Sequence, residues 1–292
     1  IYEKGSGIIA TETEPLMRSS DARFRPVDLQ FGPDGALYVV DWYNPVINHG
    51  ERALRDPKRD KTHGRIWRIT CTSKKLLEPV DMTGLTIPDL LNCLKAYEDR
   101  TRYRARIQLS MFEEAEVIKS VEHWKKQLDT RNQNYEYYKL EALWIHQQFN
   151  QPDTLLLTEL LHSRDHHIRA AATKVIVNWK EHMTDAQQTL KGMSKDSSQR
   201  VRLEAIAGLS HFRNETSVRA LLEAAMLPTD DYIAYALKEA FKHLKPVWIE
   251  MFKNDNQFLA TEPYKARLLL HPLSSEEMLK LPGYFLHDPE AG

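Results

Sequence analysis

The sequence predicts a multidomain α+β protein, in which a small antiparallel β unit is followed by an α-solenoid of helical repeats. Two observations lead to this prediction. Between residues 24 and 70, apolar and polar residues alternate with a period of two, which is typical of strands with one buried face. From Ile87 onward the apolar period is 3.6 and one helical motif recurs, which indicates repeated pairs of helices.

The composition is that of an ordinary globular protein. The 292 residues are 42% hydrophobic and 28% charged, with a net charge of −1, so we expect no nucleic-acid partner. Two cysteines, Cys71 and Cys93, are too few for a disulfide framework, and no CxxCH segment offers haem attachment. No apolar run reaches the roughly 18–20 residues of a membrane span. Because the chain begins at Ile1 without a signal-peptide pattern, we expect a piece of a longer protein.

The β unit is predicted to contain three or four strands. Residues 27–31 and 36–42 form two strands joined by Pro33-Asp34-Gly35, whose residue types suit a tight turn. A long loop over residues 46–63 leads to a third strand at 64–70, and residues 6–13 form a further extended candidate. Such a unit is too small to bury a core alone. It therefore either stacks with further sheets as the terminal blade of a β-propeller, or packs edge-on against the helices.

The helical part repeats a motif in which a basic residue stands three places before an apolar one in an alanine-rich run. The basic positions are Arg104, Lys139, Arg169 and Arg202, spaced by 35, 30 and 33 residues, and residues 232–237 form a weaker copy. Partner helices are predicted at 113–128, 152–162, 184–193 and 215–226. This alternation is the pattern of HEAT-like repeats. We expect the basic residues to form a structural ladder with acids of the neighbouring repeats.

The predicted organisation has four segments. Residues 1–73 form the terminal blade with its charged loop, 74–96 a linker and first helix, 97–255 the HEAT-like solenoid, and 256–292 a C-terminal extension. A short helix is predicted from Ser274 to Leu279, because Ser274 and Glu277 fit a capping box. Acidic caps are expected just before four of the inner helices, at Asp99, Asp165, Asp196 and Asp230.

The loop over residues 49–63 holds the side chains with the most plausible chemistry, because loops on a rigid sheet often carry binding residues. In one interpretation, Arg52, Arg55 and Arg59 form a cationic pocket for the carboxylates of a cofactor or substrate. In another, His49 or His63 is a general base that removes a hydroxyl proton during oxidation.

Two further interpretations of this loop remain open. Asp56 and Asp60, with backbone oxygens, contribute to a calcium site. Alternatively, the pairs Arg55–Asp56 and Arg59–Asp60 hold the loop on the sheet and His63 bonds to the strand ends, so that the loop has a structural role or docks a partner.

We expect structural roles for several other polar residues. Asp28 and Asp41 stand at strand ends, where carboxylates usually accept hydrogen bonds from neighbouring backbone N–H groups. His166 and His167 follow Asp165 at the start of a helix. We expect a solvated helix cap there, because adjacent helical residues point to different sides.

The β unit resembles a known family. The runs 24–45 (FRPVDLQFGPDGALYVVDWYNP), 54–60 (LRDPKRD) and 63–69 (HGRIWRI) resemble the end of the propeller in the membrane-bound dehydrogenases related to the quinoprotein glucose/sorbosone dehydrogenases. In that family HEAT-like repeats follow the propeller, which is similar to the order of segments here. Most of a propeller lies outside this chain, so catalytic roles do not carry over by analogy.

The resemblance implies an activity. It implies a six-bladed propeller that oxidises a sugar or other alcohol, with pyrroloquinoline quinone (PQQ) and calcium as cofactors. Electrons would pass to a cytochrome c-type haem domain, and the location would be extracytoplasmic, either periplasmic or membrane-associated. The competing expectation is a non-catalytic protein-interaction scaffold, with a protein partner on the solenoid.

Overall fold

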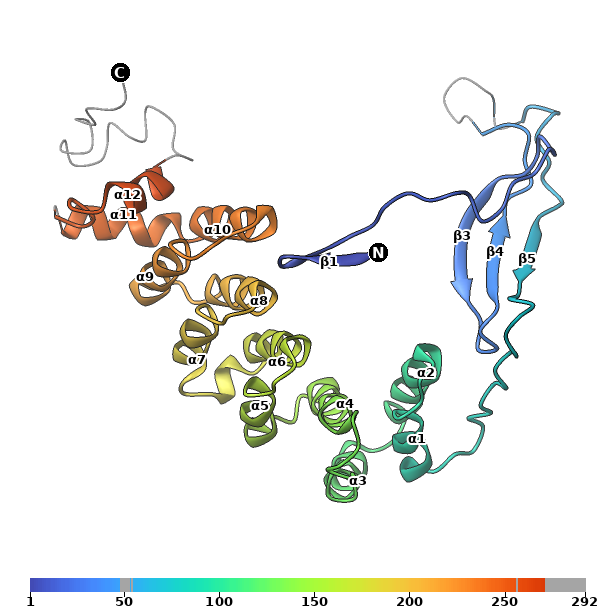
Figure 1. Cartoon of the computed structure of the whole chain (residues 1–292), viewed down its shortest axis with the longest axis horizontal. Coiled ribbons are helices and arrows are strands. Elements are labelled where there is room, and N and C mark those ends of the chain that lie inside the picture. The colour runs from blue at the N-terminus through green and yellow to red at the C-terminus, as the bar shows by residue number, and fades with distance from the viewer. Residues whose placement is uncertain (48–52, 54, 256, 271–292) are drawn as a thin grey trace. The chain divides into compact units, whose positions relative to one another are not determined.

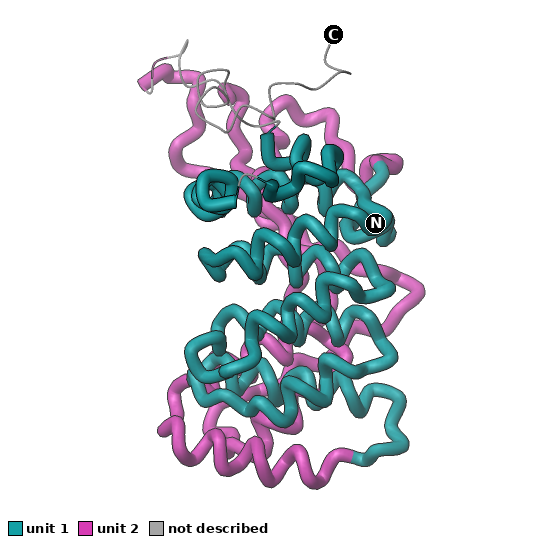
Figure 2. The backbone as a smooth tube through the Cα atoms, turned by 90° about the vertical axis from the view of Figure 1, so that its left-hand side faces the viewer, with its two compact units in different colours: residues 1–11, 129–292 teal, residues 12–128 magenta. Residues whose placement is uncertain are grey.

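The computed structural model describes residues 1–47, 53, 55–255 and 257–270 (Figure 1). The chain forms two compact units (Figure 2): residues 1–11 group with residues 129–292, and residues 12–128 form the second unit. The order of elements confirms the predicted fold class, with small antiparallel sheets followed by helical repeats. Among the described residues, no helix is both long and apolar enough to cross a membrane.

A three-stranded antiparallel sheet occupies the first part of the second unit. Its strands are β3 (Pro26–Phe31), β4 (Leu37–Asp41) and β5 (Arg65–Ile69), paired in that order, with an irregularity near Pro26. The predicted turn is present, and Gly35 adopts the positive φ of 78° that favours glycine. The sheet buries little: Val39 is covered, but the apolar side chains of the edge strand β3 are 58–61% exposed at Val27, Leu29 and Phe31.

Three helices complete the second unit: α1 (Ile87–Cys93), α2 (Asp99–Leu109) and α3 (Glu114–Lys126). A capping box fixes the start of α1, because Thr86 and Asp89 each accept a hydrogen bond from the other's backbone N–H. Buried Leu91, Leu109 and Val121 lie in the apolar interior of these helices.

The first unit is a solenoid of paired helices. One row of helices is α4 (Tyr135–Gln148), α6 (His166–Asn178), α8 (Gln199–Leu209) and α10 (Asp231–His243). The other row is α5 (Thr154–Leu161), α7 (Ala186–Met193), α9 (Glu215–Ala224) and α11 (Lys245–Asn254), with a short 3-10 turn at Lys180–His182 and α12 (Pro263–Leu270) at the end. Helix α8 packs against α6, α10, α7 and α9, which is the stacking of a repeat protein. The predicted partner helices are confirmed.

Small residues let the rows approach closely. Ala172, Ala205 and Ala220 are completely buried, among equally buried leucine, isoleucine and valine side chains. An alanine at such a position leaves room for the backbone of the neighbouring helix, while the longer side chains fill the space between repeats.

The predicted basic ladder is confirmed in part. Arg169 donates from Nε and Nη2 to the two carboxylate oxygens of Asp196 in the next repeat, at 2.8 Å each, and Lys139 pairs with Glu159. For Arg202 the prediction of an acidic partner was wrong, because its Nη2 donates to the carbonyl of Pro228 at 2.6 Å.

Arg104 was also wrongly assigned to the basic ladder, because Arg102 holds the equivalent position in the first repeat. Through Nη1, Arg102, Arg169 and Arg202 each donate to the carbonyl oxygens six and five residues earlier in the chain. Each of the three stands four residues after its helix N-cap. Arg104 instead donates to the carbonyl of Val80 in the linker.

Three local predictions need correction. Glu98, not Asp99, caps α2, and Ser198 is the N-cap residue of α8, with its N–H bonded to Asp196. Residues 6–13 do not form one extended segment: β1 (Tyr2–Lys4) and β2 (Gly7–Ile9) pair as an antiparallel hairpin. The helix predicted at residues 274–279 lies outside the described residues.

Replacing Ala205 by phenylalanine should destabilise the solenoid. The site is completely buried between helices, and overpacking typically costs about 1–3 kcal/mol in free energy of unfolding. The matched control is Ala207→Phe, because Ala207 lies on the same helix but is exposed. Urea denaturation compares the two variants. An Ala205→Phe protein as stable as the Ala207→Phe protein would contradict this repeat register.

Candidate functional site

The predicted cationic loop is held mainly by its own backbone. His49 and Arg52 lie outside the described residues, and Arg55 is exposed. Asp56 accepts the N–H of Lys58 on its side chain at 2.8 Å. Arg59 donates from Nε to the carbonyl of Ala53 at 3.1 Å. These contacts are those of a loop that stabilises its own turns.

Asp60 and His63 are the predicted site residues that the structure brings together. The Asp60 carboxylate accepts the N–H groups of Thr62 and His63, and its Oδ2 lies 2.9 Å from Nδ1 of His63. The hydrogen bond from the Thr62 backbone, with those of His63, lowers the pKa of Asp60 to about 2. In the described part of the chain, neither Asp56 nor Asp60 belongs to a group of three side chains able to share a metal ion. The catalytic role of His49 and His63, the arginine pocket and the calcium site stay predictions.

Asp41, at the end of β4, is 1% exposed and its carboxylate accepts four hydrogen bonds. Its Oδ1 accepts the backbone N–H groups of Arg25 and Tyr43, at 2.8 and 3.0 Å. Its Oδ2 accepts Nε of Arg65 and Nε1 of Trp67, at 2.8 and 2.9 Å. Burial raises the pKa of Asp41, but these hydrogen bonds outweigh it and hold the pKa below its usual value. The sequence indicated the backbone donors, while the two side-chain donors come from a strand 24 and 26 residues away.

Arg65 completes this arrangement. Its guanidinium lies 4.0 Å from the ring centroid of Tyr43 and 5.0 Å from that of Trp67, which are cation–π distances. Nη1 also donates to Asp21 at 3.0 Å. Because Arg65 pairs with both Asp41 and Asp21, the arrangement ties β4 and β5 to the segment before β3.

A second constellation forms where the hairpin β1–β2 meets the solenoid. At its turn the buried Ser6 donates its N–H and its hydroxyl to the two carboxylate oxygens of Asp230, at 2.5 and 2.9 Å. Its carbonyl accepts Nη1 of Arg200 at 3.0 Å. Asp230 also caps α10 by accepting the N–H of Ile233. Every polar group of Ser6 is therefore bonded to α8 or to the start of α10. We call Arg200, Asp230 and Tyr232 the hairpin dock.

Two glycines make this close approach possible. Gly5 has a φ of 63°, and a Cβ there would lie 2.2 Å from a carboxylate oxygen of Asp230. A Cβ on Gly7 would lie 2.1 Å from the ring of Tyr232. Any side chain at either position would collide with the dock. The run Gly5-Ser6-Gly7 is thus a signal in the sequence that a hairpin turn approaches another surface, which our sequence analysis missed.

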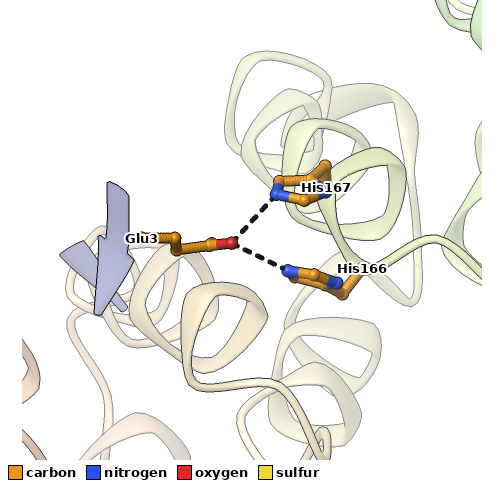
Figure 3. Close-up of side chains that lie close together, drawn as sticks. All are labelled: Glu3, His166 and His167. Atoms are coloured by element: carbon orange, nitrogen blue, oxygen red, sulfur yellow. Dashed lines mark hydrogen bonds and ion pairs between the residues drawn. The ribbon is translucent and has the colours of Figure 1, made fainter. Parts of the chain in front are cut away.

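The β1 strand of the hairpin brings a carboxylate to two histidines (Figure 3). Oε2 of Glu3 lies 3.4 Å from Nε2 of His166 and 3.1 Å from Nε2 of His167. The expectation that the two histidines diverge was wrong: their ring centroids are 4.0 Å apart and both rings reach the same oxygen. At the first turn of α6 no preceding turn restricts the side chains. Sequence reasoning could not find Glu3, which is 163 residues away.

A cleft of about 670 Å³ lies beside these residues. Tyr2, Glu3 and Ile8 of the hairpin contribute one side, and the helices α4, α6 and α8 contribute Trp144, His167, Lys174, Arg200 and Glu204. Burial raises the pKa of the Glu3 carboxyl, but hydrogen bonds from His166 and His167 outweigh it, so the pKa lies below its usual value. Glu3 is therefore a carboxylate at neutral pH.

Comparison with protein-family models gives two matches. Residues 3–73 match a domain of unknown function (DUF7133), which runs across both the hairpin and the three-stranded sheet. Residues 154–242 match HEAT repeats, which agrees with the helices α5 to α10 and with the repeat pattern in the sequence. No curated protein matches the chain.

The contacts of Asp41 should be lost only in acid. Because the pKa of Asp41 lies below the ~3.9 of an unfolded aspartate, its stabilising effect is present above that pH and is lost as the pH falls through the folded-state pKa. We expect the NMR signal of the Trp67 indole N–H to stay constant from pH 7 to about 4 and to move below it. The control is the indole N–H of Trp248, which donates to the carbonyl of Phe241. A Trp67 signal that titrates near neutrality would contradict this account.

Proposed function

We propose that this chain is a non-catalytic interaction scaffold, in which the HEAT-like solenoid holds an extended β hairpin on the N-terminal ends of α6, α8 and α10. The observation that carries the proposal is the docked turn of Ser6, whose three polar backbone and side-chain groups are all bonded to Asp230 and Arg200. Buried polar groups of a folded protein are normally hydrogen-bonded, so these contacts are those of a turn that packs as part of the folded first unit.

The hairpin dock recognises backbone shape more than side-chain type. Asp230 offers two acceptors and Arg200 a donor to the turn, and the Tyr232 ring occupies the space that a side chain at Gly7 would need. Recognition of main-chain groups, with specificity from a few side-chain positions, is how binding domains hold extended β segments. The hairpin belongs to the same unit as the solenoid and is followed in sequence by the second unit.

A second function, alcohol oxidation, is supported by a different observation. The exposed Val27, Leu29 and Phe31 lie on the edge strand β3, and apolar edges of this kind call for a covering sheet. This supports a blade of a larger quinoprotein-like propeller, with an extracytoplasmic location and electrons passing to a cytochrome c-type domain. His49 or His63 would be the base. PQQ would bind to Arg52, Arg55 and Arg59, and calcium to Asp56 and Asp60. We place this function second, because three hydrogen bonds carry the scaffold proposal, whereas the observation that supports oxidation is the exposure of three apolar side chains.

Replacing Gly7 by alanine should release the hairpin from the solenoid. The new Cβ would meet the Tyr232 ring, and overpacking of about 1–3 kcal/mol corresponds to a change of roughly 5- to 150-fold in an equilibrium constant. We expect amide hydrogen exchange at residues 2–9 to become faster by that factor, with exchange in α6 and α8 unchanged.

The matched control is Gly192→Ala, because a Cβ on Gly192 meets nothing within 4 Å. Residues 2–9 that exchange as fast in the wild type as in the Gly7→Ala protein would refute the docked hairpin.

An oxidation assay separates the two functions. The protein at its natural length is supplied with PQQ and calcium, and dye reduction is measured with a panel of sugars and alcohols. The scaffold function predicts no turnover in the wild type. Turnover that falls by roughly 10²-fold or more in a His63→Gln variant, the usual contribution of a general base, would instead support alcohol oxidation.

A further inference from the structure

We propose that Glu3, His166 and His167 form a site for a divalent transition-metal ion of the zinc type, which fastens the hairpin to α6. The inference rests on the proposed function, since it requires the hairpin to be docked. Glu3 lies in the middle of β1 and not at the Ser6 turn, so the two attachments depend on different residues.

The spacing of the ligand atoms suits zinc. The two histidine Nε2 atoms lie 3.4 and 3.1 Å from the same oxygen of Glu3, and the three potential ligand atoms all lie within 4.8 Å of one another. With zinc–ligand bonds of about 2.0–2.1 Å, a tetrahedral site separates neighbouring ligand atoms by about 3.3 Å. A small further convergence of the two imidazoles would place all three atoms at that separation.

Both ring nitrogens of His167 lie within hydrogen-bond distance of a carboxylate oxygen. Its Nδ1 lies 2.9 Å from Oδ1 of Asp165, and its Nε2 lies 3.1 Å from Oε2 of Glu3. A neutral imidazole carries a single N–H, so it can donate to only one of these carboxylates. A second proton on the ring would satisfy both carboxylates, and a metal ion between Nε2 and Glu3 would do the same while the Nδ1 proton goes to Asp165.

Asp165 is suited to orient the ligand. It is the N-cap of α6, where Oδ1 accepts the backbone N–H of His167 at 2.8 Å. The same oxygen is within hydrogen-bond distance of the imidazole of that residue. A carboxylate behind a metal-binding histidine fixes the tautomer and the direction of the other nitrogen.

The ligand types favour a transition metal over calcium or magnesium. Two imidazole nitrogens and one carboxylate suit zinc and its neighbours, whereas the harder cations prefer oxygen ligands. The side chains of Glu3, His166 and His167 are 34%, 38% and 62% exposed. An ion can thus enter from solvent, and water can take the fourth position.

The expected consequence is that a bound metal ion strengthens the attachment of the hairpin to α6. Glu3 comes from β1 and the histidines from α6, so an ion bound to all three bridges the hairpin and the solenoid. Because the ion binds the docked form preferentially, it shifts the docking equilibrium in proportion to its concentration over its dissociation constant.

Zinc titration of the whole chain tests the site. By calorimetry we expect one zinc ion per chain, no measurable binding of magnesium, and an affinity at least roughly tenfold lower in the Glu3→Gln variant, a loss that even second-shell changes produce. The matched control is His162→Gln. His162 follows α5 and precedes α6, and its ring bonds to the carbonyl of Thr158 in α5. The exposed thiol of Cys71 is replaced by serine in all proteins to remove a competing ligand.

Hydrogen exchange at residues 2–9 provides the second measurement. We expect zinc to slow exchange there in the parent protein and in His162→Gln, but not in Glu3→Gln or in His166→Ala/His167→Ala. Equal zinc affinity in the parent and Glu3→Gln proteins, or bound zinc without slower exchange, would overturn the metal site. Protection of residues 2–9 without any zinc binding would overturn it while leaving the scaffold intact. Rapid exchange at these residues with and without zinc would overturn both proposals.

Discussion

The carboxylate of Asp230 is the interaction on which the arrangement of the first unit depends. This carboxylate both caps α10 and holds the hairpin. Its Oδ1 accepts the N–H of Ile233 at the start of α10 and the hydroxyl of Ser6. Burial alone would raise the pKa of Asp230, yet its hydrogen bonds hold that pKa below the usual value. Helix capping and hairpin docking therefore share one ionised group, and the hairpin can dock only on a correctly started α10.

The arginines of the repeats explain why Asp230 stands in the right place. Arg202 on α8 donates to the carbonyl of Pro228, two residues before Asp230, and to carbonyls of the loop before its own helix. Arg169 connects α6 in the same way to Asp196, ahead of α8. Helices α6 and α8 thus each hold the loop that precedes the next inner helix. These arginine contacts hold the N-termini of α8 and α10 in place. The hairpin lies on those N-termini, so the same contacts support the hairpin dock.

Local patterns predicted the helices well, and distant contacts escaped them for a physical reason. Periodicity and alanine content are properties of a short stretch of sequence, so the helix pairs could be predicted. The search for recurring basic residues, however, chose Arg104 in place of Arg102 for the first repeat. Counting from the cap at Glu98 would have chosen Arg102. The contacts of Ser6 with Asp230 and Arg200 join residues some 200 positions apart, and only the two flanking glycines hint at them. In the loop, the Asp56 carboxylate accepts the backbone N–H of Lys58, whereas the structural interpretation of the sequence was an ion pair with Arg55.

The buried charge arrangement of the sheet and the partly exposed one at the hairpin differ in how donors and acceptors are matched. Asp41 receives four donors, and Arg65 contacts two rings and two carboxylates, with its Nη2 held in an ion pair 2.8 Å from Oδ2 of Asp41. At the hairpin, both nitrogens of His167 face carboxylates, although one neutral ring supplies one proton. A second proton on the His167 ring or a metal ion at Nε2 would satisfy both carboxylates. The proposed metal site therefore lies at the hairpin end of the solenoid, where the charge balance depends on what binds.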